Sequence, residues 1–291
     1  NNRSGIVICG SYGLGNAGDE SILKAILQEV RTVAPPEDIT VLSRNPEETK
    51  LCHGVRSLHM FDLPAIYRLM GRTKLYINGG GSLIQDVTSR RSLWYYLFTL
   101  RMAKRRGCKV LMYGCGIGPV KHPKDVALTR KTLNGCVDAI TLREDSSLKE
   151  LQRFGVTNPE IVLASDPALT LQRAAEADID RMMEQNGLTP HGSYLGICLR
   201  DWPGFAEKAP VFAAAVRYAR SEHGLTPVFF SINHRSDGAA ADQVARCLEE
   251  TPCILRQPLS TELTLGLMSR MQAVISMRLH GLIFAAGQGV P

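Results

Sequence analysis

The residues best suited to chemistry stand near the end of the sequence, in the run Ser276-Met-Arg278-Leu-His280. Arg278 carries a permanent positive charge, and His280 can gain or lose a proton near neutral pH. An apolar run, 273–276, precedes the pair and small residues follow it, which predicts a strand that gives way to a helix. Such a junction faces the crevice where open α/β sheets bind ligands. The pair therefore predicts a site for an anionic substrate that needs proton transfer.

A glycine-rich loop near the start of the chain is the second candidate site. Residues 9–20 read CGSYGLGNAGDE, between a predicted strand and a predicted helix. The Gly-x-Gly-x-x-Gly spacing of residues 13–18 fits a dinucleotide fingerprint. However, Asp19 and Glu20 stand where a pyrophosphate would approach, and the like charges would repel. Asn16 and Asp19 suit sugar hydroxyls better, while a plain turn with Asp19 as helix cap is the structural alternative.

A second glycine loop reads Ile77-NGGGSLIQ-Asp86 and follows another predicted strand. Three consecutive glycines are tolerated where the backbone passes unusually close to a ligand or to another loop. In the structural explanation Ser82 is a helix N-cap and Asp86 a first-turn acid. We favour a functional role because Gln85 and Asp86 would lie near the mouth of a cleft.

Further arginines follow other predicted strands. Arg143 comes after the strand 139–142, and Arg200 after the strand 194–199. Several guanidinium groups at carboxyl edges suit a substrate with carboxylate and phosphate oxygens, which they bind through paired hydrogen bonds. A lone arginine is equally well explained as the partner of a carboxylate, and that alternative stays open for Arg143.

The elements that position these residues alternate between short apolar runs and helical patterns, as in parallel α/β sheets. The predicted strands are 5–9, 38–42, 75–78, 109–113, 139–142, 160–163, 194–199, 227–232, 253–255 and 273–276. The clearest helix is 144–154, with Gly155 as its C-terminal stop. Others are expected at 209–222, 239–249 and 261–271.

The pattern indicates an α/β protein of two Rossmann-like, doubly wound parallel-sheet domains that face each other across a cleft, as in GT-B glycosyltransferases. We place an N-terminal domain, the expected acceptor side, at 1–172 and a linker at 173–192. The C-terminal domain, the expected donor side, is 193–291. We expect this last domain to be truncated, with apolar surface exposed near Val290 and available for dimerisation, because 289–291 read as the opening of another strand.

Composition narrows the class of protein. Of 291 residues, 44% are hydrophobic and 21% charged, which argues against whole-chain disorder. The net charge of +6 favours anionic ligands, but no basic stripe with interleaved aromatics points to nucleic acid. The eight cysteines lie mostly in apolar runs, which suggests reduced core thiols, and no zinc-type spacing is present. No bilayer-spanning segment is evident, so we expect a cytoplasmic enzyme, with the inner face of the cell membrane as an alternative place.

Three blocks, taken together and in order, resemble the polysaccharide pyruvyltransferase family, in particular bacterial members that modify secondary cell-wall polymers. The blocks are GSYGLGNAGDESIL, INGGGSLIQD and SMRLHGLIFAAGQGVP. The resemblance implies a GT-B-like fold and phosphoenolpyruvate as co-substrate. We expect no cofactor and no metal. It also implies a 4,6-linked pyruvyl ketal on a hexose. The implied acceptor is N-acetylmannosamine in a lipid-linked precursor, whose product helps to retain S-layer proteins.

The resemblance maps the family's Arg-x-His block onto Arg278 and His280. We expect His280 to protonate the methylene carbon of the enol, and Asp19 or Asp86 to accept the proton of an attacking hydroxyl. We expect Arg278 to bind phosphoenolpyruvate. We add Arg143 and Arg200 because they are further cations at the carboxyl ends of strands. For the acceptor we expect Gly15, Asn16, Gly80, Gly81, Ser82 and Gln85.

Two other functions remain as alternatives: a nucleotide-sugar glycosyltransferase and a non-catalytic sugar-binding module. An NAD-dependent dehydrogenase is disfavoured by the acidic pair after the first glycine loop. Peripheral membrane contact is a minority interpretation of the aromatic and basic segment 93–107. Homo-oligomerisation stays open.

Overall fold

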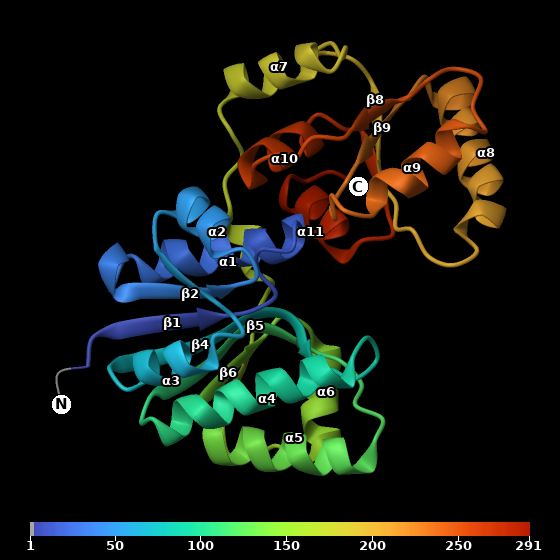
Figure 1. Ribbon diagram of the computed structural model, residues 1–291. Helices are drawn as coiled ribbons and strands as arrows, with labels where there is room; N and C mark the ends of the chain where they lie inside the picture. Colours follow the sequence, from blue (N-terminus) through green and yellow to red (C-terminus); the bar gives the residue numbers. More distant parts are fainter. Residues whose placement is uncertain (1–2) are drawn as a thin grey trace. The chain divides into compact units, whose positions relative to one another are not determined.

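The computed structural model describes residues 3–291, which divide into two compact units (Figure 1). Unit 1 holds residues 3–14 and 19–167, and unit 2 holds residues 15–18 and 168–291. The first glycine loop is therefore divided, because its tip packs with the C-terminal half of the chain.

Unit 1 is built on a seven-stranded, wholly parallel sheet in the order β3-β2-β1-β4-β5-β6-β7. The strands are β1 (Gly5–Cys9), β2 (Ile39–Ser43), β3 (Arg56–His59), β4 (Thr73–Ile84), β5 (Lys109–Ile117), β6 (Ala139–Leu142) and β7 (Glu160–Leu163). The order reverses between β1 and β4, which is the ligand-binding switch point of doubly wound sheets.

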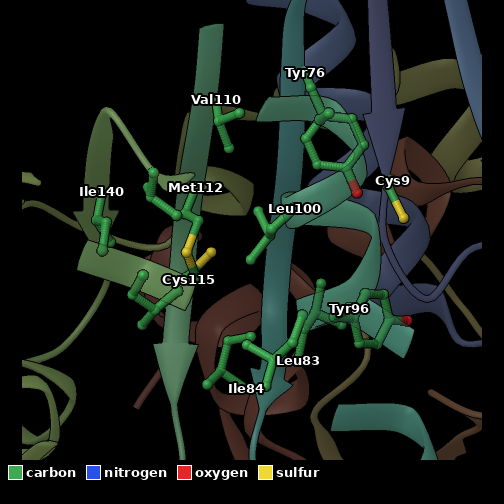
Figure 2. Close-up of a cluster of buried hydrophobic side chains, with 14 of the residues drawn as sticks. Cys9, Tyr76, Leu83, Ile84, Tyr96, Leu100, Val110, Met112, Cys115 and Ile140 are labelled. Carbon is green, nitrogen blue, oxygen red and sulfur yellow. The ribbon is translucent and has the colours of Figure 1, made fainter. Parts of the chain in front are cut away.

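Helices cover both faces of this sheet (Figure 1). They are α1 (Ala17–Val30), α2 (Pro46–His53), α3 (Leu63–Met70), α4 (Arg90–Arg105), α5 (Pro123–Cys136) and α6 (Asp145–Phe154). Side chains alternate along the strands, so that Ile6 and Ile8 pack under α1 while Val7 and Cys9 pack under α4. Figure 2 shows the second face, where Cys9 and strand residues of β4, β5 and β6 gather around Leu100 of α4.

Strand β4 differs most from expectation. The sequence predicted a strand over 75–78 that ends before the glycines, but β4 pairs with β5 through Gly79 and Gly81 as far as Ile84. Ser82 therefore lies within a strand, and Ser89 is the residue that caps α4, through the amide of Ser92. The explanation of Ser82 as an N-cap was wrong. Glycine has a low strand propensity, but its backbone can still form the hydrogen bonds of a sheet, so the strand continues through the glycines.

One strand was missed altogether. β3 has polar residues at both ends and a half-exposed middle, because it is the edge strand of the sheet and buries little apolar surface. A short strand of this kind carries almost no hydrophobic signal.

Unit 2 contains a smaller parallel sheet in the order β10-β9-β8-β11. Its strands are β8 (Tyr194–Cys198), β9 (Thr226–Phe230), β10 (Cys253–Leu255) and β11 (Ala273–Ser276). Its helices are α7 (Glu176–Gln185), α8 (Phe205–His223), α9 (Asp237–Ala245), α10 (Thr261–Met268) and α11 (Leu279–Gly287). The prediction of two doubly wound parallel sheets is confirmed.

The segment 173–192, expected to be a linker, contains helix α7. Ile179 of α7 packs against Gly266 of α10, and Arg270 forms ion pairs with Glu176 and Asp180. These contacts lie within unit 2.

Exposed apolar surface was expected near Val290, and the Val290 side chain itself is only 9% exposed. The end of the chain folds back onto the edge strand, where the carbonyl of Pro291 accepts a hydrogen bond from the amide of Val274. The exposed apolar side chain here is Ile275, on the same edge strand.

Candidate functional site

The Arg278 and His280 pair lies at the switch point of the sheet in unit 2. β8 and β11 are neighbours in this sheet, and the loops after them carry Arg200 and Arg278 at the same carboxyl edge. As the sequence predicted, a strand gives way to a helix: β11 ends at Ser276 and α11 begins at Leu279. Arg278 is thus the N-cap residue, and His280 lies in the first turn of α11.

A buried carboxylate holds the Arg278 guanidinium. Nε of Arg278 donates to one oxygen of Asp237 at 3.2 Å, and Nη2 donates to the other oxygen. Nη2 also donates to the Ser236 hydroxyl at 3.2 Å. Asp237 is 1% exposed and also accepts the amide of Asn233 at 2.8 Å. This two-pronged pair fixes the plane of the guanidinium and leaves Nη1 without a hydrogen bond among the described residues.

The turn between β11 and α11 is tightly built. The Ser276 hydroxyl accepts from the amide of Arg278 at 3.0 Å and donates to its carbonyl at 2.7 Å. A Cβ on Gly281 would lie 2.2 Å from Oγ of Ser276 and 2.9 Å from Sγ of Cys198, so only glycine fits there. Burial raises the pKa of the Cys198 thiol to about 12, which keeps it neutral. Glycine at 281 thus lets α11 begin directly against the ends of β8 and β11.

The imidazole of His280 lies against the first glycine loop. A Cβ on Gly18 would lie only 2.3 Å from Nδ1 of His280. The ring centroids of His280 and Phe284, one helical turn later, are 5.9 Å apart. The absence of a side chain at Gly18 therefore makes room for this imidazole.

The tip of that loop is tied to the end of β9 by backbone hydrogen bonds. Asn16 and Asn233 form an antiparallel bridge, and the amide of Ala17 donates to the carbonyl of Ile232 at 2.7 Å. The amide of His234 donates to the carbonyl of Gly15 at 3.1 Å. Gly15 and Asn16, expected to bind the acceptor, are therefore brought to the same unit as Arg278 and His280.

Two arginines at this edge have no acidic partner. Arg200 is exposed after β8, and Arg235 is exposed after β9, beside Gly15. Within residues 3–291, neither side chain forms an ion pair. Arg200 thus keeps an uncompensated charge at this edge, while Arg235 was not among the predicted site residues.

His234 is a further residue that sequence reasoning did not select. Burial lowers the pKa of His234, although nearby Asp237 acts in the opposite direction. Its Nδ1 is buried and forms no hydrogen bond with the described residues. The signal was present as a histidine two residues after the predicted strand 227–232, next to Arg235.

In unit 1 the first glycine loop is held by its own side chains. The Tyr12 hydroxyl donates to the carbonyl of Gly79 at 2.6 Å, and burial raises the pKa of this phenol. The amide of Gly13 donates to Oε1 of Glu20 at 2.7 Å. The Glu20 carboxylate therefore already accepts the hydrogen bond of a backbone amide that a dinucleotide pyrophosphate would need. This agrees with the repulsion argued from the sequence.

The three glycines of β4 are explained by close packing inside unit 1. A Cβ on Gly80 would lie 2.0 Å from Cγ2 of Ile22, and one on Gly79 would lie 2.6 Å from the Tyr12 hydroxyl. Gly81 faces α1 more loosely, with Oδ1 of Asp19 at 3.3 Å from such a Cβ. The sequence predicted that a ligand or another part of the chain passes close to these glycines. At Gly79 and Gly80 the close neighbours are helix α1 and Tyr12.

Arg143 is held by carboxylates. Its side chain is 5% exposed and pairs with Asp166 at 3.0 Å and with Glu144 at 3.5 Å. Nη2 also donates to the exposed Ser82 at 3.2 Å. This environment is that of an arginine which serves as the structural partner of carboxylates, the alternative that the sequence left open for Arg143.

Gln85 and Asp86 lie in the turn that leaves β4. Gln85 bonds to the side chain and the amide of Thr88. Oδ2 of Asp86 accepts the amides of Lys121 and His122 at 2.8 and 3.2 Å. Asp86 therefore joins this turn to the one after β5, rather than standing in the first turn of a helix.

Metal and membrane signals are weak in the part of the chain that the structure describes. No group of three or more histidine, cysteine, aspartate or glutamate side chains is arranged to hold a metal ion there. Among residues 3–291, every helix is too short or too polar to cross a bilayer. All eight cysteines are free thiols.

Comparison with solved structures shows a shared fold. Anabaena Alr3699/HepE in complex with UDP-glucose is 12% identical with a TM-score of 0.63, over 98% of this chain and 79% of that one. The UDP-GlcNAc 2-epimerase of Methanocaldococcus jannaschii is 11% identical with a TM-score of 0.69, over 98% and 82%. E. coli ADP-heptose heptosyltransferase II is 13% identical with a TM-score of 0.53, over 99% and 83%. At these identities the likeness establishes two Rossmann-like domains of the GT-B type.

Comparison of sequences is more specific. No curated protein has a significantly similar sequence. Residues 16–291 match the family model described as polysaccharide pyruvyl transferase.

Proposed function

Because the chain belongs to the polysaccharide pyruvyl transferase family, we propose that it transfers the pyruvyl group of phosphoenolpyruvate to a hexose as a 4,6-ketal. The proposed acceptor is N-acetylmannosamine in a lipid-linked precursor of a secondary cell-wall polymer, the kind that anchors S-layer proteins. No cofactor takes part, and the reaction would take place on the cytoplasmic side of the membrane.

The observation that carries this proposal is the junction between β11 and α11. It combines an arginine whose plane is fixed by Asp237 with a histidine in the first turn of a helix. Arg200 adds a cation at the same sheet edge. A carboxylate and phosphate donor that needs one proton matches this set of groups.

In the proposed reaction His280 delivers a proton to the methylene carbon of phosphoenolpyruvate, which leaves C2 as an oxocarbenium-like centre. Two sugar hydroxyls attack C2 in turn, and phosphate departs as the C2–O bond to it breaks. One hydroxyl proton goes to the carboxylate base and the other leaves with the phosphate, while the proton given up by His280 is replaced when the base returns its proton. Arg200 and the N–H donors of Arg278 that Asp237 leaves unused bind the donor's carboxylate and phosphate. We do not assign this role to Arg143, because two carboxylates already neutralise it.

Asp19 is our proposal for the base that accepts a hydroxyl proton. Asp86 is a weaker candidate, because its carboxylate already accepts two backbone amides. For the acceptor, we propose Gly15, Asn16, Gly81, Ser82 and Gln85. Gly80 is less suited to this role because Ile22 fills the space beside it.

The test is phosphate release from phosphoenolpyruvate with a set of acceptors, together with mass detection of the ketal product. We expect release with a lipid-linked N-acetylmannosamine acceptor and no release without a sugar. Calorimetry with UDP as ligand addresses the rival, a nucleotide-sugar glycosyltransferase. Tight UDP binding combined with no phosphate release from any acceptor would favour that rival.

Replacing His280 with alanine tests the proposed acid. Turnover should fall by about a hundredfold to ten-thousandfold, the usual contribution of general acid catalysis, while acceptor binding stays nearly intact. His191→Ala, at an exposed position of the same unit, is the matched control and should keep full activity. Unchanged turnover in the His280 variant would refute the mechanism.

A further inference from the structure

A cavity of about 530 Å³ in unit 1 is not part of the site described above. It opens at the carboxyl ends of β1, β2 and β3 and is bounded by the start of α4. The lining residues are Ser11, Leu14, Arg44, Met60, Phe61, Ser89, Arg91, Ser92, Tyr95 and Tyr96. This volume falls within the range of roughly 300 to 1,000 Å³ typical of small-molecule sites, and the edge is where such sheets bind ligands.

The charges of this cavity are all of one sign. Arg44 and Arg91 line it, and no aspartate or glutamate does. Neither arginine forms an ion pair or a side-chain hydrogen bond within residues 3–291. Burial raises the pKa of Tyr95 and Tyr96, so neither phenol adds negative charge. Two other cavities of the molecule, by contrast, have glutamates among their lining residues.

Arg91 stands at an electrostatically unfavourable position. It is the second residue of α4, where the positive end of the helix dipole disfavours a cation, and no acid occupies this first turn. The neighbouring Arg90 is neutralised by Asp125 at 2.7 Å, but Arg91 is not. Local stability therefore does not account for arginine at position 91, whereas an anionic ligand would.

Arg44 is held in place by a row of aromatic rings. Its guanidinium lies over the Phe61 ring, 4.8 Å from the centroid. Phe61 meets Tyr95 edge-on at 5.3 Å, and the Tyr95 hydroxyl donates to the carbonyl of Met60. Stacking of this kind orients a guanidinium without using its N–H donors. The donors of Arg44 thus stay available to an oxyanion in the cavity.

We propose that this cavity binds the phosphate of a phosphorylated saccharide through Arg44 and Arg91. The hydroxyls of Ser11 and Ser92 and the ring surfaces of Tyr95 and Tyr96 contact the sugar. Two guanidinium groups suit a phosphate or diphosphate, and neutral hydroxyls with aromatic surface suit a sugar ring. That the ligand carries a sugar rests on the proposed function, because the cavity would then bind the phosphate of the acceptor. That the ligand is an anion rests on the cavity alone.

Binding is measured by calorimetry, without turnover, so that failure here is distinguishable from failure of the proposed reaction. The probes are N-acetylmannosamine 1-phosphate, free N-acetylmannosamine, inorganic phosphate, phosphoenolpyruvate and UDP. The variants are Arg44→Gln and Arg91→Gln, with Arg72→Gln as control, an exposed arginine of unit 1 outside this cavity. Thermal unfolding is recorded for each variant.

We expect the sugar phosphate to bind the unaltered protein, and each cavity variant to weaken that binding by about tenfold or more through loss of a charge-assisted hydrogen bond. Arg72→Gln should leave binding unchanged, and phosphoenolpyruvate binding should be the same in all variants. The midpoint of thermal unfolding should not fall in Arg91→Gln, because a cation is removed from a helix N-terminus.

Three results would overturn the proposal. The first is sugar phosphate binding that is absent, or equal in the cavity variants and the control. The second is a specific loss of phosphoenolpyruvate binding in the cavity variants, which would assign the cavity to the donor. The third is inorganic phosphate or UDP binding as tightly as the sugar phosphate, which would remove the saccharide from the assignment.

Discussion

At the scale of single residues, the arginines differ in what neutralises them. Arg143 and Arg278 each meet a buried carboxylate, Asp166 or Asp237, whereas Arg200 meets none among the described residues. The sequence could not reveal this, because those carboxylates are 23 and 41 positions away along the chain. Which arginine meets which carboxylate over such distances depends on the order of the strands in the sheet. The residue types alone do not reveal that order.

Asp237→Asn should destabilise unit 2. The amide keeps a hydrogen bond acceptor for the Asn233 backbone but leaves the largely buried Arg278 without its counter-charge. We expect the free energy of unfolding in urea to fall by about 2 to 3 kcal/mol. The Michaelis constant for phosphoenolpyruvate should also rise, since the guanidinium is no longer fixed.

The control for this change is Asp201→Asn, at an exposed position after β8. It removes the same charge from the same unit and should leave unfolding unchanged. If both variants were equally stable, Asp237 would not be the residue that fixes Arg278.

His234 should make unit 2 less stable in mild acid. Burial lowers its pKa below the ordinary value of 6.5, so the unfolded chain takes up the proton more readily than the folded one. Stability is therefore fully present above pH 6.5 and falls as the pH decreases towards the folded-state pKa. Urea unfolding at several pH values between 7 and 5 measures this slope.

The slope should be smaller in His234→Gln, which cannot be protonated. His191→Gln, an exposed position in the same unit, should retain the slope of the unaltered protein. An identical pH dependence in all three proteins would contradict a role for His234.

At the scale of elements, strand β4 shows where propensity reasoning fails. Three glycines predicted a loop, because glycine has low strand propensity and a high conformational entropy. In the fold the same glycines are needed to bring α1 and Tyr12 close to the strand, and the ladder with β5 continues past them. The constraint comes from packing between elements, which the local sequence does not record.

Gly80→Ala should therefore be strongly destabilising. The residue has a φ of 66°, and a Cβ would collide with Ile22 in the buried face of α1. We expect a loss of about 2 to 4 kcal/mol in the free energy of unfolding, measured by urea denaturation.

Gly135→Ala is the matched control in unit 1. This glycine lies in α5, has nothing within 4 Å of a Cβ, and does not have a positive φ. Alanine there should be neutral or stabilising by up to about 1 kcal/mol. Equal losses in the two variants would mean that Gly80 is not under a special constraint.

At the scale of the whole molecule, the first glycine loop joins the two halves of the sequence. Its tip, residues 15–18, belongs with unit 2, although it lies more than 200 positions before β9 and β11. The tip of this loop and the His280 block, two motifs that the sequence suggested separately, are thereby brought together in unit 2. Their meeting could not be inferred from spacing, because no local pattern relates them.

Gly18→Ala tests that meeting. Gly18 is the second residue of α1, where alanine is a better helix former, so stability should not decrease. A methyl group there would displace the His280 imidazole, which can rotate, and we expect kcat to fall by about a hundredfold. Phosphate release from phosphoenolpyruvate and thermal unfolding are measured together.

Gly238→Ala is the control, because this glycine of α9 has open space around its Cα. Its activity should match that of the unaltered protein. Full activity in Gly18→Ala would show that the position of His280 does not depend on the loop.

The sequence by itself determined the two parallel-sheet domains, the junction that carries Arg278 and His280, and the three motifs that resemble the family. These features follow from hydrophobic periodicity and from the residue types at strand ends. Both can be read from a local stretch of ten to twenty residues. The tertiary structure alone decided which arginines keep an uncompensated charge, that β4 runs through its glycines, and that Gly18 lies against His280. It also brought Arg44 and Arg91 to one cavity, because strand order places the ends of distant segments at a common edge.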